Sequence, residues 1–126
     1  MEPKEIMAEG KYIRMVRQGK WEYVERTSQR SAVVIVAVVG EHTAHKLVLV
    51  EQYRTAVDRR VIELPAGLVG DLAGQADEAL EAAAGRELEE ETGYAAESFE
   101  RLTEGPPSAG LSSELVVFVR ANGLQK

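Results

Sequence analysis

The sequence has no cysteine, which excludes disulfide bonds, zinc–thiolate sites and thiol nucleophiles. It also has no long apolar run, because the longest, residues 32–39, is far shorter than the ~20 residues that a membrane-spanning helix needs. Residues 1–6 have no apolar core of the kind that a signal peptide carries. The net charge of −6 argues against a general nucleic-acid-binding surface. We therefore expect a cytoplasmic protein that binds neither nucleic acid nor membranes.

The composition is that of an ordinary globular domain. The chain has 126 residues, of which 44% are hydrophobic and 29% charged, so residues 1–126 are expected to form one domain with a real hydrophobic core. An acidic protein can still bind anionic phosphates where a divalent cation and a few arginines reverse the local field.

Alternating apolar residues predict several β-strands. Residues 12–17 and 21–26 alternate on either side of Gly19, which predicts a β-hairpin. The β-branched run 31–39 is typical of a buried strand, and residues 45–51 are expected to pair with it. Further strands are expected at 61–64, before Pro65, and at 99–102 and 115–120.

One helix is expected between about residue 78 and residue 92. Asp77 is its expected N-cap and Gly93 its expected C-cap, while Leu80, Ala84 and Leu88 recur at the spacing of a core-facing stripe. Antiparallel hairpins with a single helix packed on them predict the α+β class.

Clustered carboxylates at the end of this helix are energetically unfavourable. Glu87, Glu89, Glu90 and Glu91 lie in about the last turn, where each anion costs roughly 0.3–1 kcal/mol against the helix dipole. Glu87 and Glu91 are also a like-charge pair one turn apart. A bound cation would remove this conflict, although an acidic helix face exposed to solvent is the alternative interpretation.

The spacing lets two of these carboxylates act together. Glu87 and Glu91 can face the same point in space, and Glu90 borders that face, where Arg86 can hold it one turn away. Carboxylate oxygens in this arrangement suit Mg²⁺ or Mn²⁺.

The helix also carries a recognisable motif. Glu78, seven residues, and then Arg86-Glu87-Leu88-x-Glu90-Glu91-x-Gly93-Tyr94 resemble the Nudix box. The resemblance implies a Nudix hydrolase, which uses Mg²⁺ or Mn²⁺ to cleave a nucleoside diphosphate linked to another group. The box glycine normally lies six positions before the first glutamate, where this chain has Leu72. Gly67 is the natural counterpart, so the loop 67–77 is five residues longer than the pattern.

Flanking segments are similar to the ADP-ribose pyrophosphatase, or ADP-sugar hydrolase, branch of that family. The similar segments are residues 21–27, residues 51–54 followed by 63–67, and residues 108–114, where Ala109 replaces the branch's proline. Together they cover the chain from about residue 11 to residue 120. For ADP-ribose, the branch implies AMP and ribose 5-phosphate as products.

The resemblance implies a homodimer in which an N-terminal hairpin, about residues 1–30, reaches across the two-fold axis from a Nudix core at about 31–126. It implies that Trp21 stacks on the nucleobase, unless it is a core or interface aromatic. His42 and His45 are expected to be ordinary surface residues. The resemblance also implies the metal ligands Glu87, Glu90, Glu91 and the Ala66 carbonyl, and the catalytic residues Glu90, Glu91 and Arg86. The implied substrate contacts are Trp21, Glu22, Arg26, Gly67, Arg54 and Glu114. Arg54 is otherwise a surface arginine, and Glu114 is otherwise an exposed loop residue.

The branch usually continues with an acidic loop, strands and a helix beyond the strand that ends near Arg120. That loop commonly supplies a glutamate as base or metal ligand, and no residue here matches it. The chain is thus a fragment, or the ordered part of a longer protein, or it has its base at Glu90 or Glu91. Two other functions stay open. One is a binding or regulatory module with little catalysis, and the other is a hydrolase of another derivative such as GDP-mannose, a dinucleoside polyphosphate or a nucleoside triphosphate.

Overall fold

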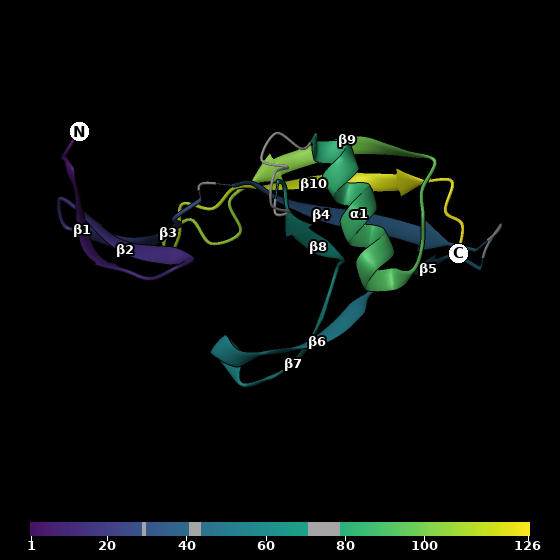
Figure 1. Cartoon of the computed structure of the whole chain (residues 1–126), viewed down its shortest axis with the longest axis horizontal. Helices are drawn as coiled ribbons and strands as arrows, with labels where there is room; N and C mark the ends of the chain where they lie inside the picture. The colour runs from purple at the N-terminus through teal and green to yellow at the C-terminus, as the bar shows by residue number, and fades with distance from the viewer. Residues whose placement is uncertain (29, 41–43, 71–78) are drawn as a thin grey trace.

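The computed structural model describes residues 1–28, 30–40, 44–70 and 79–126, and it has the expected α+β fold. Its described strands form a three-stranded, a five-stranded and a two-stranded sheet. The helix α1 (Leu80–Thr92) packs on the five-stranded sheet, and Figure 1 shows the three-stranded sheet at the far end of the long axis.

The N-terminal sheet contains the predicted hairpin, formed by β2 (Ile13–Gln18) and β3 (Trp21–Arg26). Gly19 lies in its turn with φ +62°, a conformation that glycine adopts without steric cost. A further strand, β1 (Lys4–Glu9), pairs with β2 and was not predicted. All its residues are exposed, so it lacks the alternation that marks a half-buried strand.

The central sheet is mixed. Its strands β4 (Ala32–Val39) and β10 (Val116–Asn122) are parallel neighbours, and β9 (Ser98–Gly105) pairs antiparallel with β10. The predicted strands near 31–39 and 115–120 are confirmed, and the one at 99–102 is longer than expected. The strands supply Val33, Ile35, Val117 and Val119 to the core.

The prediction that residues 45–51 form one strand along β4 is wrong. Only the short strand β5 (Lys46–Leu47) pairs with the end of β4. The first half of that edge is taken by β8 (Ala66–Leu68), an unpredicted strand that directly follows Pro65.

The chain between β5 and β8 leaves the central sheet. The strands β6 (Val50–Arg54) and β7 (Arg59–Glu63) form a separate antiparallel hairpin that projects away from the core (Figure 1). The short 3₁₀ helix η1 (Thr55–Val57) makes its tip. Arg54 is the last residue of β6, and Glu63 is the last residue of β7.

The predicted core stripe of α1 is confirmed. Ala84 and Leu88 are fully buried, and Leu80 packs against the same cluster. Ala79 is the residue before the helix, whereas Asp77 and Glu78 lie outside the described residues. The helix ends at Gly93, whose φ of +79° is the left-handed geometry of a C-cap.

The C-terminal end of α1 receives a positive charge from a distant part of the chain. Lys126 donates from Nζ to the Thr92 carbonyl oxygen at 3.2 Å, and Nζ lies 4.4 Å from the centroid of the Tyr94 ring. A cation there offsets the negative end of the helix dipole. In the part of the chain that the structure describes, no helix is long and apolar enough to cross a membrane.

Candidate active site

Glu87 is a buried carboxylate on the face of α1 that meets β8. It is 8% exposed, and its Oε1 accepts a hydrogen bond from Arg86 Nη1 at 2.7 Å. Arg86 also donates from Nη2 to the Leu68 carbonyl oxygen at 3.3 Å, which ties the helix to β8. Arg86 therefore holds both the acidic helix face and the strand opposite it.

Gly67 lies directly against Glu87. A Cβ atom on Gly67 would fall 2.0 Å from Glu87 Cδ and 2.3 Å from its Cγ, closer than any real contact. The predicted loop glycine is therefore a position where the backbone approaches a carboxylate closely.

Ala66 faces the second carboxylate of the pair. Its N–H donates to Glu91 Oε2 at 3.2 Å. Between β8 and β4, Ile35 N donates to Pro65 O and Val69 N donates to Ser31 O. In an antiparallel ladder the hydrogen-bonded pairs alternate with non-hydrogen-bonded pairs, so Ala66 and Val34 form a non-hydrogen-bonded pair. The N–H and C=O of Ala66 thus both point away from β4, toward the side of Glu91.

The pKa of Glu91 is raised above the ordinary glutamate value, chiefly because its carboxyl group is partly shielded from water, although the residue as a whole is exposed. The N–H of Ala66 opposes this shift, while the negative charge of Glu87 adds to it. Arg54 lowers the pKa of Glu91 and Glu63 raises it, each by a smaller amount. The site thus contains two carboxylates that repel each other, a repulsion that a cation would relieve.

The donors present fit a divalent cation that keeps part of its own water shell. Among the described residues, no three Asp, Glu or His side chains gather into a complete metal cage. Two carboxylates and one carbonyl remain, at Glu87, Glu91 and Ala66. Mg²⁺ is commonly bound in this way, by one or two carboxylates together with waters and substrate phosphates.

Glu90 does not lie beside Ala66 and Gly67 as Glu91 and Glu87 do. Its side chain is 56% exposed, and its Oε2 lies 3.7 Å from Arg86 Nη1, the i,i+4 contact expected from the sequence. Its expected share in a metal site stays a prediction. Glu78, the first residue of the motif, lies outside the described residues.

Arg54 is held by Glu63 through two hydrogen bonds. Nε donates to Oε2 and Nη2 donates to Oε1, both at 2.8 Å. The hydrogen bond from Arg54 is the main reason that the pKa of Glu63 is lowered. Glu63 was not among the site residues predicted from the sequence. The feature that could have identified it is that Arg54 and Glu63 lie on the same face of the hairpin formed by β6 and β7 around η1.

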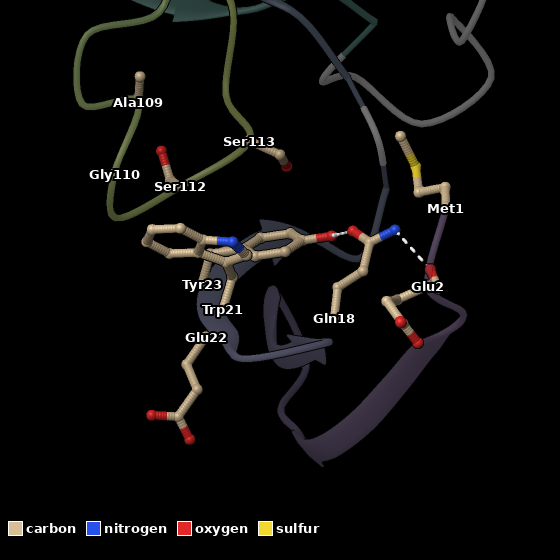
Figure 2. Close-up of a pocket in the computed structure, with 10 residues that line it drawn as sticks. All are labelled: Met1, Glu2, Gln18, Trp21, Glu22, Tyr23, Ala109, Gly110, Ser112 and Ser113. Carbon is tan, nitrogen blue, oxygen red and sulfur yellow. Dashed lines mark hydrogen bonds between the residues drawn. The ribbon is translucent and has the colours of Figure 1, made fainter.

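A pocket of about 550 Å³ lies beside Trp21, at the end of the molecule where Figure 1 shows the three-stranded sheet. Figure 2 shows Trp21 and Tyr23 facing a loop that contains Ala109, Ser112 and Ser113. Trp21 is 68% exposed, so the alternative of a core aromatic is wrong.

The loop over Trp21 is joined to β3 by backbone hydrogen bonds. Val24 N donates to Leu111 O at 2.8 Å, and Ser113 N donates to Val24 O at 3.0 Å. Segments far apart in the sequence thus form the two walls of the pocket. Gln18 fixes a third side, because its Oε1 accepts from Tyr23 Oη at 2.9 Å and its Nε2 donates to the Glu2 carbonyl at 2.8 Å (Figure 2).

The other expected substrate residues near this pocket are paired with each other or with a neighbour. Arg26 donates from Nε to Glu114 Oε2 at 3.1 Å. Glu22 accepts from Arg17 Nη2 at 3.3 Å, and Figure 2 shows its carboxylate pointing away from the indole ring. His45 is exposed, as expected, and His42 lies outside the described residues.

The structure therefore places the expected site residues in two groups. Figure 1 shows β3 at one end of the long axis, whereas β8 and α1 lie in the central part of the molecule. The first group is carried by the β6–β7 hairpin, β8 and α1: Arg54, Ala66, Gly67, Arg86, Glu87 and Glu91, with Glu90 at its edge. The second group is carried by β3 and the loop opposite it: Trp21, Glu22, Arg26 and Glu114.

A sequence profile of the NUDIX domain matches residues 28–123. The chain belongs to the Nudix family. A solved structure titled as an ADP compounds hydrolase superposes on 98% of this chain and 66% of its own, with a TM-score of 0.72 at 24% identity. That likeness confirms the fold.

Curated relatives cover most of the chain. It is 36% identical over 98 residues to an ADP-ribose pyrophosphatase of Bacillus subtilis, a match to 78% of this chain and 49% of the relative. It is 35% identical over 136 residues to an ADP-sugar pyrophosphatase of Mus musculus, covering 95% of this chain and 60% of the relative. A methanol dehydrogenase activator of Bacillus methanolicus is 38% identical over 95 residues, a match to 75% of this chain and 47% of the relative. The chain thus spans about half the length of the two bacterial relatives.

Proposed function

We propose that the chain hydrolyses the pyrophosphate bond of ADP-ribose or a related nucleoside diphosphate sugar, with Mg²⁺ or Mn²⁺ as the metal. The products would be a nucleoside monophosphate and a sugar phosphate. The observation that carries the proposal is the pair Glu87 and Glu91 on one face of α1, held against the backbone at Ala66 and Gly67. Membership of the Nudix family and the names of the pyrophosphatase relatives support the reaction class.

In this proposal Glu87, Glu91 and the Ala66 carbonyl hold the cation, with Arg86 keeping Glu87 in place. When bound, a divalent cation would neutralise charge on the phosphate oxygens and lower the pKa of the attacking water. Glu90 suits the role of base, because its exposed carboxylate can accept a proton from that water. Arg54 offers a planar guanidinium to the phosphate oxygens.

Trp21 is the proposed nucleobase contact. An indole face stabilises a stacked base by about 1–3 kcal/mol, and the exposed Trp21 lines this pocket. Since β3, which carries Trp21, lies at one end of the long axis and apart from α1, which carries the carboxylates (Figure 1), we propose a homodimer in which each Trp21 serves the partner's carboxylates. Glu22, Arg26 and Glu114 would contact the same ligand from the hairpin side.

The reaction is tested by assaying nucleoside monophosphate release from a panel of nucleoside diphosphate sugars with Mg²⁺, with Mn²⁺ and with EDTA. We expect turnover of ADP-ribose that requires the metal. Glu91→Gln should lower kcat at least about 100-fold. Glu89→Gln removes an equal charge from an exposed position on the same helix and should leave kcat within about twofold. No turnover of any panel member would overturn the enzyme proposal.

The dimer is tested by complementation between two impaired variants, Trp21→Ala and Glu91→Gln. In a mixed dimer one of the two sites has both native residues, so coexpression should restore about a quarter of wild-type activity at low substrate concentration. Light scattering gives the molar mass of the wild type in parallel. If the coexpressed variants show only the sum of their separate activities, Trp21 and Glu91 do not form one site across a dimer.

A regulatory module is the second candidate. It is favoured by the relative named as a methanol dehydrogenase activator, and by the absence of a complete three-carboxylate cage among the described residues. Tight binding of ADP-ribose without turnover would support this candidate over the enzyme.

A further inference from the structure

We propose that Glu63 is a positioning residue, which fixes the guanidinium of Arg54 so that one edge is presented to the diphosphate. The inference rests on the proposed function and adds to it a residue whose side chain does not itself bind the substrate. Glu63 would act through Arg54 alone, by setting the plane and the direction of its guanidinium group.

The two side chains share one face of a hairpin that leaves the core. In the register of β6 and β7, Arg54 lies opposite Arg59 near the tip and Glu63 lies opposite Val50 at the base. The arginine must therefore extend back along the face of the hairpin to reach the carboxylate. Two hydrogen bonds of 2.8 Å hold it there.

The geometry leaves the other edge of the guanidinium for a second anion. A guanidinium has five N–H donors, which form two forks suited to bidentate acceptors. Glu63 occupies the fork made by Nε and Nη2. The fork made by Nη1 and the second hydrogen of Nη2 points away from Glu63, and it matches two oxygens of a phosphate.

Arg54 and Glu63 also lie near the proposed site. Arg54 lies close enough to Glu91 to act on its charge, and so does Glu63. The diphosphate would therefore meet the Arg54 edge on one side and the cation held by Glu87 and Glu91 on the other. Without Glu63, the exposed arginine on a projecting hairpin would sample many rotamers, and binding would have to order it.

A second ion pair on the same hairpin has no such role and serves as the control. Arg60 and Glu51 lie on the opposite face, because their positions alternate with those of Arg54 and Glu63. Arg60 Nε is 3.0 Å from Glu51 Oε1, and more than half of each side chain is exposed. Breaking this pair tests whether a loss of hairpin stability alone explains an effect.

The experiment compares Glu63→Gln, Arg54→Lys, the double variant and Glu51→Gln as full-length proteins. Steady-state assays with ADP-ribose give kcat and KM, and calorimetric titration with ADP in EDTA gives an affinity that needs no turnover. We expect Glu63→Gln to raise KM and the Kd for ADP about tenfold, while kcat changes less than about threefold. Glu51→Gln should leave all three values within about twofold.

The double variant separates positioning from a second, independent contact. If Glu63 acts only through Arg54, adding Glu63→Gln to Arg54→Lys should cause no further rise in KM. A further tenfold rise would overturn the proposal. So would a fall in KM for Glu63→Gln, because Glu63 would then compete with the phosphate for Arg54.

The two proposals fail in different ways. If the affinity for ADP falls in Glu63→Gln but the wild type shows no turnover, the hydrolase is overturned and the positioning role stands. Turnover with an ADP affinity and a KM that Glu63→Gln does not change would overturn the positioning role alone. A wild type that neither binds ADP nor turns over ADP-ribose would overturn both.

Discussion

Gly67 and Glu87 come so close that no side chain fits between them. A methyl group on Gly67 would fall 2.0 Å from the carboxyl carbon of Glu87, which is itself buried and held by Arg86. Glu87, a metal ligand in the proposed site, is thus held in place by Arg86, the next residue before it, and by the absence of a side chain at Gly67 on the facing strand.

Replacement of Gly67 by alanine should displace Glu87. The overlap costs about 1–3 kcal/mol of folding free energy, and the displaced carboxylate should lower kcat by at least about tenfold. Thermal unfolding and steady-state kinetics measure the two effects. Wild-type values in both assays would show that Glu87 moves aside without consequence.

Gly85→Ala is the matched control on α1 itself. A Cβ there meets the ring of Phe99 at 3.7 Å, an ordinary contact, and Gly85 lies in the helix interior. The substitution should stabilise the protein by about 0.5–1 kcal/mol, because alanine loses less backbone entropy in a helix. Chemical denaturation gives the value, and a loss of stability would mean that the contact with Phe99 cannot adjust.

The stability of the metal-free protein should depend on Glu91 in a defined sense. Its pKa is higher in the folded chain than in the unfolded one, so the folded state binds more protons between the ordinary glutamate pKa and that raised value. Unfolding free energy should therefore fall as pH rises through this window. Glu91→Gln has no charge there, and it keeps an oxygen that can accept the Ala66 N–H.

Urea titrations of both proteins in EDTA, from acidic to neutral pH, measure this difference. The variant should gain stability relative to the wild type as pH rises, and Mg²⁺ should then stabilise the wild type more than the variant. If the difference in unfolding free energy between wild type and Glu91→Gln stays constant with pH, the pKa of Glu91 is not raised in the folded protein.

Trp21→Ala should raise KM for ADP-ribose by roughly tenfold and leave kcat nearly unchanged, because stacking on the base acts on the ground and transition states alike. Trp21→Phe keeps an aromatic face and should recover most of the affinity. If both KM and kcat stay at wild-type values in the alanine variant, the pocket beside Trp21 does not hold the base.

Lys126→Gln should lower the unfolding free energy by about 1 kcal/mol, since it removes a cation from the C-terminal end of α1 and from the ring of Tyr94. Thermal unfolding at low salt measures the loss, and added salt should reduce it. Lys46, an exposed residue of β5, provides the control substitution. An equal loss in both variants would assign the effect to net charge.

Local patterns predicted those parts of the fold that local physics determines. The hairpin around Gly19, the apolar strand β4 and the cap at Gly93 each follow from the residues within the element. The course of residues 45–68 was not predictable in this way. There the result depends on β8 and β5 sharing one edge of β4, which is a competition between distant segments.

In the site, too, the features set by neighbouring residues were predicted and those set by distant segments were not. The spacing of Glu87 and Glu91 follows from one helical turn, and the structure keeps both beside Ala66 and Gly67. Glu63 was missed because its importance comes from Arg54 across a hairpin whose pairing the sequence analysis placed elsewhere. Glu90 was selected from its place on the helix and from the family motif. In the structure its side chain is exposed and lies 3.7 Å from Arg86, and its role as a ligand stays a prediction.

The parallel pairing of β4 with β10 also bears on how the chain is made. Residues 32–39 leave the ribosome well before residues 116–122, and one edge of β4 pairs with that late segment. The N-terminal sheet, built from neighbouring segments, can form as soon as it emerges. An apolar strand edge must therefore stay open until residues 116–122 have been made, and this nascent stage is where we expect the chain to depend most on protection from aggregation.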